Sequence, residues 1–333
     1  MKYLKINEDC KFVTGHKRSV IYDLGNENYH FIPNALCELA NTFDKKAIEE
    51  IYVFYGKSNE KYISEYLSFL IDKKFAIICT KEQCDIFQPL NFEWHNPSTI
   101  TNAIIEINTD IDYKSIIKQL EHLGCYHLEL RSNNILQLFD FNNILQLFEN
   151  TAIKSINIIL KYNNDIEGVK ELINQYKRIS SVILHSSPEN QIINEMVHFT
   201  LIKKQLIRTS DFLTISQDFF NVNIPLFTES QKYNTYFNRK VTIDYQGNIK
   251  NCLNIDENFG NINEDRIGDI IDKIDFSKYW LVSKDDIQIC CDCEFRYMCV
   301  DTRKPCKDKN GKWHFETDCN YDPYTSQWKN DYE

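Results

Sequence analysis

The distribution of cysteines is the feature of this sequence that most limits how the chain can fold. Seven of the twelve cysteines lie between Cys252 and Cys319, and four of them fall within "QICCDCEFRYMC", residues 288–299. Cys290 and Cys293 form a Cys-x2-Cys pair, which can present two thiolates from one tight turn while distant cysteines complete the site. In a reducing compartment, clustered thiols bind metal more often than they form disulfides. This segment is therefore expected to fold around its thiols.

Spacing alone leaves three interpretations of these cysteines open. The first is a structural zinc site, the second is a 4Fe–4S cluster, which requires four thiolates, and the third is a set of disulfides or inert thiols. The other five cysteines (Cys10, Cys37, Cys79, Cys84 and Cys125) are scattered among apolar neighbours. These five are expected to be small buried hydrophobic residues.

The first residues, the lengths of the apolar runs and the net charge indicate where the protein acts and which partners it has. The start, "MKYLKINEDCKF", lacks the apolar core of a signal peptide, and no run approaches the ~18–20 apolar residues of a membrane span. We therefore expect a cytoplasmic protein with no membrane partner. The net charge of −10 argues against nucleic acid as a main partner.

The pattern of the first 97 residues predicts a small winged-helix-like domain. "YLKI", "SVIYDL" and "YHFIPN" are typical of strands, and helical spacing follows Pro33. The clearest helix is expected over 59–74, where Ile63, Leu67 and Leu70 make one apolar stripe. "FAIICT" and "CDIFQP" are expected to close the domain as a hairpin.

Residues 98–230 alternate strands with helices, which predicts βα units, a parallel sheet and a partial barrel. Helices are expected over 112–124 and 165–179. The strand candidates are "AIIEI", "YHLEL", "SINIIL", "SVILH" and "QLIRT".

Residues 231–333 are less regular and contain the cysteine cluster. "VTIDYQGNIKNCL" is expected to be a hairpin that turns at Gln246–Gly247 and places Cys252 at its end. Together the three segments predict an α/β multidomain protein: a winged-helix-like domain over 1–97, a degenerate partial βα barrel over 98–230 and a cysteine-rich domain over 231–333.

The C-terminal segment resembles a SPASM domain, the auxiliary cluster-binding module of many peptide-modifying radical-SAM enzymes. The matching features are a cysteine after a hairpin, the "GN" of Gly260–Asn261, Cys-x2-Cys-x5-Cys and a last cysteine. The resemblance implies one 4Fe–4S cluster held by Cys290, Cys293, Cys299 and Cys319, with zinc as an alternative occupant. In the family, Cys252 and Cys306 would match ligands of an inner cluster. The stretch upstream of Cys252 has no further cysteine, so an inner cluster is not expected.

The sequence departs from radical-SAM enzymes in the loop after the first barrel strand. That loop reads "NTDIDY", and Cys-x3-Cys-x2-Cys occurs nowhere in the chain. Without three thiolates, no cluster can bind and cleave S-adenosylmethionine, so we expect a barrel that acts as a scaffold rather than a functional radical-SAM enzyme.

The N-terminal segment resembles a RiPP recognition element, the leader-binding module of enzymes that modify ribosomal peptides. The resemblance implies that an extended precursor peptide adds to the edge of the strand from Tyr29 to Pro33. Tyr29 and Phe31 on this strand, and Tyr62, Tyr66 and Lys73 on the helix over 59–74, are the residues expected to contact it. A DNA-binding winged helix and a purely structural cap are the alternatives.

The combination resembles the SPASM-domain peptide maturases of grasp-with-spasm systems, in which an ATP-grasp ligase joins side chains of a precursor peptide. It implies an accessory maturase or adaptor that binds the precursor, carries one iron–sulfur cluster and works with the ligase, without catalysis of its own. Two alternatives stay open: a redox enzyme that acts on the peptide through its cluster, and a zinc-stabilised regulatory protein.

Overall fold

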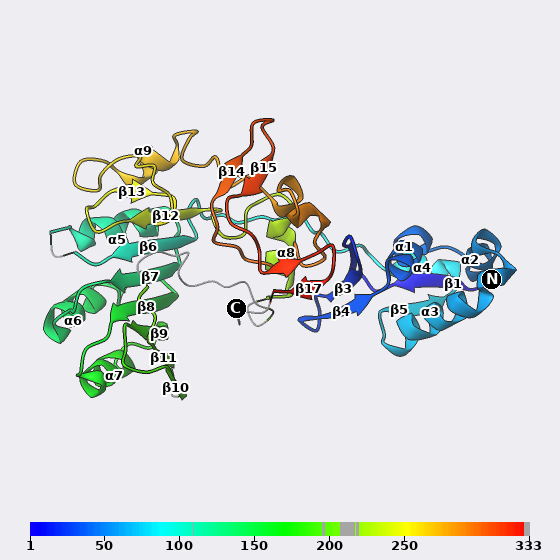
Figure 1. The fold of residues 1–333 in the computed structure, drawn as a ribbon, viewed down its shortest axis with the longest axis horizontal. Coiled ribbons are helices and arrows are strands. Elements are labelled where there is room, and N and C mark those ends of the chain that lie inside the picture. Colours follow the sequence, from blue (N-terminus) through cyan, green and yellow to red (C-terminus); the bar gives the residue numbers. More distant parts are fainter. Residues whose placement is uncertain (109, 195–196, 207–216, 218–219, 330–333) are drawn as a thin grey trace.

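A mixed α/β arrangement is built around one large sheet, seen on the left of Figure 1. The computed structural model describes residues 1–108, 110–194, 197–206, 217 and 220–329. Within these residues the large sheet has eight strands in the order β10-β11-β9-β8-β7-β6-β12-β13. The five central pairings are parallel, and the pairings at both edges are antiparallel. The predicted parallel sheet is therefore confirmed. The strands are β6 (Asn102–Glu106), β7 (His127–Ser132), β8 (Ser155–Lys161), β9 (Ile179–His185), β10 (Gln191–Asn194), β11 (His198–Ile202), β12 (Lys240–Ile243) and β13 (Ile249–Lys250).

Four of the five predicted barrel strands coincide with β6 to β9 to within two residues at each end. The fifth, "QLIRT", runs from Gln205 into residues 207–209, which lie outside the described part of the chain. Gln205 and Leu206 are not in a strand, and β11 is the strand that pairs in parallel with β9. The hairpin predicted around Gly247 is confirmed as β12 and β13.

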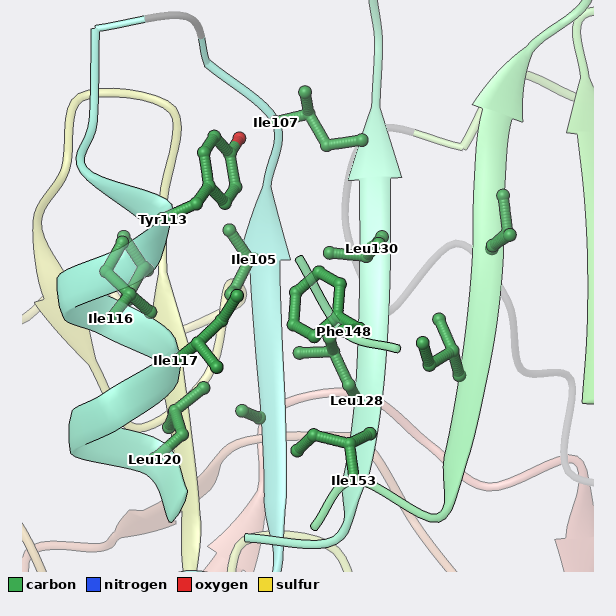
Figure 2. Packing of buried hydrophobic residues seen from close by; sticks show 14 of the residues in the cluster. Ile105, Ile107, Tyr113, Ile116, Ile117, Leu120, Leu128, Leu130, Phe148 and Ile153 are labelled. Atoms are coloured by element: carbon green, nitrogen blue, oxygen red, sulfur yellow. The ribbon is translucent and has the colours of Figure 1, made fainter. Parts of the chain in front are cut away.

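One face of the large sheet is apolar and is covered by helices. These are α5 (Tyr113–His122), α6 (Leu138–Gln146), α7 (Ile166–Asn174) and α9 (Ile267–Ile271). Figure 2 shows Ile117 and Leu120 of α5 directed toward β6, which carries Ile105, with Leu130 on the next strand, β7. Asp112 caps α5 through the backbone N–H groups of Lys114 and Ser115.

The core on this face continues through Ile267 to Phe276. β12 and β13 therefore belong to the large sheet although they lie beyond residue 230, where the sequence placed the start of the C-terminal domain. Their apolar residues Val241, Ile243 and Ile249 pack in the same core as β6, which explains the continuity.

The N-terminal segment forms a smaller unit with its own core. A three-stranded antiparallel sheet, β2-β3-β4, is followed by helices, and two of its strands, β3 and β4, are the predicted "SVIYDL" and "YHFIPN". The third strand is β2, which was not predicted, whereas the predicted strand "YLKI" is β1 and pairs with β5 instead. The elements are β1 (Tyr3–Ile6), β2 (Cys10–Thr14), β3 (Ser19–Asp23), β4 (Asn28–Ile32), α1 (Asn34–Phe43), α2 (Ile48–Tyr55), the short 3-10 helix η1 (Lys57–Asn59), α3 (Glu60–Asp72), β5 (Ala76–Cys79) and α4 (Lys81–Ile86).

The closing hairpin predicted for this unit is wrong. The segment "CDIFQP" is not a strand. Its first three residues, 84–86, are the end of α4, and residues 87–89 follow the helix without regular structure. Thr80 caps α4 by accepting a hydrogen bond from the N–H of Gln83, and the Gln83 side chain accepts one from the N–H of Thr80. This reciprocal cap fixes a helix where the hydrophobic pattern alone indicated a strand.

The C-terminal residues consist of short elements that lie between the large sheet and the N-terminal unit (Figure 1). Few of them have regular hydrogen bonding, so side-chain packing determines their positions. No helix within the described ranges is both long and apolar enough to cross a membrane. The elements are α8 (Ile224–Ser230), the 3-10 helices η4 (Lys284–Asp286) and η5 (Cys290–Asp292), and the hairpins β14 (Pro305–Lys307) with β15 (Trp313–Phe315) and β16 (Tyr321–Asp322) with β17 (Gln327–Trp328).

Candidate metal centre

Four cysteines from three segments line a single cavity in the C-terminal part. Cys290 and Cys293 flank η5, Cys299 follows six residues later, and Cys319 precedes β16. The cavity has a volume of about 30 Å³ and is closed on one side by aromatic residues, including Phe295 and Trp328. These are the four cysteines that the SPASM resemblance implied as ligands.

A strained turn sets the position of the first of these cysteines. Ile289, which directly precedes Cys290, has a φ of 69°. A β-branched residue rarely adopts this left-handed conformation, and such strain persists only where surrounding structure enforces it. The Cys293 N–H then closes η5 by donating to the carbonyl of Cys290 at 3.0 Å. The turn thereby directs both ends of the Cys-x2-Cys pair toward the cavity.

A buried cluster of charges lies beside the thiols. The Lys284 ammonium is 2.8 Å from a carboxylate oxygen of Asp301, and the Arg303 guanidinium is 2.7 Å from the same oxygen. Lys284 and Asp301 are both buried, and all three residues line the cavity. Burial disfavours the charge on Lys284, but attraction to Asp301 and to the thiols of Cys299 and Cys290 raises its pKa. Two cations and one carboxylate leave a net positive charge at the cavity wall.

Burial favours the protonated form of three of these thiols, those of Cys290, Cys293 and Cys299. Burial raises the pKa of Cys299 to about 12, although Lys284 acts in the opposite direction. Burial also raises the pKa of Cys293 well above its ordinary value, and that of Cys290 against the influence of Lys284 and Arg303. Buried thiols of this kind become thiolates when a metal replaces their protons.

The donor set fits a thiolate-bound group, but its side chains are not drawn together around one point. Within the described ranges no three or more His, Cys, Asp or Glu side chains are grouped closely enough to hold one metal ion. In a 4Fe–4S cluster each thiolate binds a different iron, so four sulfurs around a common cavity are compatible with that group. A volume near that of one water molecule means that the surrounding side chains must move apart to admit it.

The remaining C-terminal cysteines lie outside this cavity. Cys252 is fully buried in a separate apolar cluster, and its thiol donates to the Tyr236 hydroxyl at 3.4 Å. Cys306, on β14, has its thiol 3.4 Å from a carboxylate oxygen of Glu316. Cys291 is exposed and does not line the cavity. The structure thus separates Cys252 and Cys306 from the four cysteines of the cavity.

The hairpin of β2 and β3 packs directly on the cysteine segment, which spans residues 290–299. The His16 N–H donates to the carbonyl of Asp292 at 2.8 Å, and the Tyr22 hydroxyl donates to the carbonyl of Glu294 at 2.8 Å. Arg296 in turn donates to the carbonyl of Thr14 at 2.7 Å. A Cβ atom on Gly15 would lie 2.8 Å from Cβ of Glu294, so this close approach requires glycine.

A buried ion pair secures the same contact. Glu294 is fully buried, and its Oε1 atom lies 2.7 Å from Nε of Arg18. The Tyr321 hydroxyl also donates to Oε1, whereas Oε2 has no hydrogen-bond partner in the described part of the chain. The guanidinium of Arg18 lies 3.5 Å from the ring centroid of Phe31 on β4. One arginine therefore connects the N-terminal sheet to the residue that follows Cys293.

The five residues predicted to contact a peptide lie on two surfaces. Tyr29 and Phe31 face the cysteine segment, with ring centroids 6.1 and 5.7 Å from that of Phe295. Tyr62 is 60% exposed on α3, and Tyr66 is partly buried against the N-terminal core. Lys73 is exposed at the C-terminal end of α3. These residues are not assembled into one site.

Sequence reasoning missed three cations of this region: Arg18, Lys284 and Arg303. Arg18 is 276 positions from Glu294, and nothing in its local sequence indicates a long-range ion pair. Lys284 was equally unmarked, although its position six residues before Cys290 placed it near the cluster. A search for basic residues on either side of the cysteines would have found Lys284 and Arg303, but not Arg18.

The fold and the cavity define a class of protein: an α/β scaffold that carries a cysteine-lined C-terminal centre and an N-terminal sheet packed against it. No protein-family model matches the sequence, and no curated protein matches it. Among solved structures, the chain is similar to SuiB of Streptococcus suis, with coverage of 89% of this chain and 94% of that chain.

The identity to SuiB is 13% for the S-adenosylmethionine complex, 11% for the protein alone and 13% for the complex with precursor peptide SuiA. The TM-scores are 0.39, 0.39 and 0.36. Scores this low establish neither a shared fold nor a shared function.

Proposed function

We propose that this chain is an accessory maturase of ribosomal peptide biosynthesis, which binds a precursor peptide and carries one 4Fe–4S cluster at Cys290, Cys293, Cys299 and Cys319. In this proposal it presents the peptide to a separate ATP-grasp ligase and performs no radical chemistry itself. The single observation that supports it best is the cavity lined by Cys290, Cys293, Cys299 and Cys319. The β2–β3 hairpin packs against the segment that carries the first three of them.

The chemistry of the cavity supports a negatively charged occupant. Four thiolates around a cluster carry net negative charge, and Lys284 and Arg303 supply positive charge at the wall. Such neighbouring charges stabilise bound clusters and tune their reduction potentials. When bound, the cluster would supply either a structural crosslink or electron transfer. The role of the chain's own residues is to hold it and to connect it to the N-terminal sheet.

The metal content is the first test. Protein purified without oxygen, or reconstituted with iron and sulfide, is expected to contain about four iron and four sulfide per chain. Cys299→Ser should remove most of this iron, because it removes one of four thiolates, whereas the exposed Cys291→Ser should keep it. About one zinc and no iron after anaerobic reconstitution would instead support the zinc-stabilised regulatory protein.

The absence of radical chemistry is the second test. The loop after β6, "NTDIDY", contains no cysteine, and its Asp112 is used to cap α5. We therefore expect no 5′-deoxyadenosine when the reduced, reconstituted protein is incubated with S-adenosylmethionine. Chromatographic detection of that product above the level given by Cys299→Ser would contradict the proposal.

Peptide binding is the third element of the proposal. The expected partner is the cognate precursor peptide, and titration of its fluorescently labelled form should give saturable binding. Saturable binding by the peptide and none by a scrambled peptide would support the adaptor. No binding by the metal-loaded chain would refute it.

A further inference from the structure

A cleft runs along the outer edge of β2, between the N-terminal unit and the cysteine segment. Its volume is about 490 Å³, within the range of clefts that hold ligands in proteins. All five residues of β2 line it. Ala40 and Asn41 of α1 form one wall, and Phe227 of α8 with Arg296 forms the other. The cleft is thus a trough with a strand along its length.

The edge of β2 that faces this cleft has no neighbouring strand within the described residues. The Gly15 N–H donates to the Arg18 carbonyl across the hairpin, so the alternation of an antiparallel pair turns the main-chain groups of Phe12 and Thr14 away from β3. Contacts from the cleft walls agree with this direction: Asn41 donates to the Phe12 carbonyl at 3.4 Å, and Arg296 donates to the Thr14 carbonyl at 2.7 Å. A strand edge with outward N–H groups is a template for an added strand.

Two of the three cations that line the cleft, Lys5 and Arg296, are paired with carboxylates, and the third is Lys11. Lys5 is paired with Glu8 at 2.8 Å and lies 3.5 Å from Asp44, and Arg296 is paired with Asp285 at 2.9 Å. The Lys11 ammonium has no carboxylate within ion-pair distance among the described residues and lies 4.1 Å from the ring centroid of Phe92. Burial lowers the pKa of Lys11, which is the penalty that a bound anion would relieve.

We propose that the cleft binds an extended acidic peptide segment as a fourth strand on β2, with a carboxylate of the segment beside Lys11. This inference rests on the proposed function, because the precursor peptide is the partner it assigns, and it names the edge and the residue chemistry that recognise that partner. The bound segment would run toward Arg296 and thus toward the cysteine segment. The sequence had placed the peptide on β4 instead.

The test is a titration of the full-length chain with the labelled precursor peptide. Lys11→Glu should weaken binding about tenfold or more, because it places a carboxylate opposite the acidic segment. Lys11→Met, which keeps the apolar stem, should weaken it about threefold and guards against misfolding of the first variant. Two matched controls, Lys17→Glu at the hairpin tip and Lys73→Glu on α3, should change it less than about twofold. Melting temperatures of all four variants establish that each is folded.

Hydrogen exchange on the unmodified chain gives a second readout that needs no variant. The amides of Phe12 and Thr14 should gain protection when the peptide binds, whereas those of Tyr29 and Phe31 on β4 should not.

Each other outcome has a definite meaning. If Lys73→Glu weakens binding and Lys11→Glu does not, the peptide lies on the β4 and α3 side, so the inference fails and the proposed function stands. Equal weakening by Lys11→Glu and Lys17→Glu would show only a general charge effect and would also overturn it. If the unmodified chain does not bind the precursor at all, both the inference and the proposed function fail.

Discussion

Arg18→Met is expected to lower the free energy of unfolding by about 3 kcal/mol, because it leaves the buried carboxylate of Glu294 without its cation. Arg18 is the cation within ion-pair distance of Glu294 among the described residues, at 2.7 Å. Glu294 is fully buried, and one of its oxygens already lacks a hydrogen-bond partner there. The Tyr321 hydroxyl alone would then have to stabilise the carboxylate. Urea unfolding followed by tryptophan fluorescence measures the loss.

Two further variants separate this effect from a loss of packing. Arg18→Met combined with Glu294→Gln should recover part of the stability, because the side chain left behind is then neutral. Lys61→Met removes a cation from an exposed pair with Glu65, at 3.9 Å, and should change stability by less than about 0.5 kcal/mol. An Arg18→Met variant as stable as the unmodified chain would mean that the hairpin does not pack on the cysteine segment as described.

The ion pair matters for function because it connects the N-terminal sheet, whose β2 edge is the proposed peptide site, with the proposed metal site. Arg18 contacts Phe31 on β4 and Glu294, the residue after Cys293. Any rearrangement of residues 290–299 on metal loading would change the contacts of Arg18 and thereby affect the N-terminal sheet. Linkage requires that a peptide bound to that sheet would influence the cysteine site to the same extent.

Local patterns predicted β6 to β9 because each of these strands contains a run of apolar residues, whereas β10 and β11 of the same sheet were not predicted. β6 to β9 pack against helices on one face of the sheet, so the buried positions follow the pattern of apolar residues in the sequence. Asp112 could be recognised as a cap in the same way. The segment "CDIFQP" failed because its apolar residues outweighed a capping signal, Thr80 with Gln83, that was present in the sequence.

The candidate site likewise has a part that the sequence could predict and a part that it could not. The four cysteines were selected by the SPASM resemblance, and the structure groups all four around one cavity. The contacts between Gly15, Arg18 and Glu294 could not be predicted, because they join residues far apart in the chain through a surface with no periodic pattern. β2 was also missed: its five residues include two that are buried and two that are half-buried, which gives no clear alternation.

Asp301→Asn is expected to cost about 3–5 kcal/mol in the metal-free protein, because it removes the one carboxylate shared by two cations at the cavity. Lys284 lies 2.8 Å and Arg303 2.7 Å from the same oxygen, and Lys284 is almost fully buried. The amide of asparagine keeps the shape but carries no charge, so the two cations would repel each other in a poorly hydrated space. Asp318→Asn, which affects an exposed pair with Lys329, is the matched control and should cost less than about 0.5 kcal/mol.

The same substitution should cost less once the cysteine site is loaded. Four thiolates around a metal or cluster carry net negative charge, so they would take over part of the role of Asp301 beside Lys284 and Arg303. The measurement is the difference in unfolding free energy between Asp301→Asn and the unmodified chain, made with and without bound metal. A smaller difference in the loaded form places the negative group next to these cations. An equal difference in both forms would mean that the metal is bound elsewhere, and the assignment of Cys290, Cys293, Cys299 and Cys319 as its ligands would have to be abandoned.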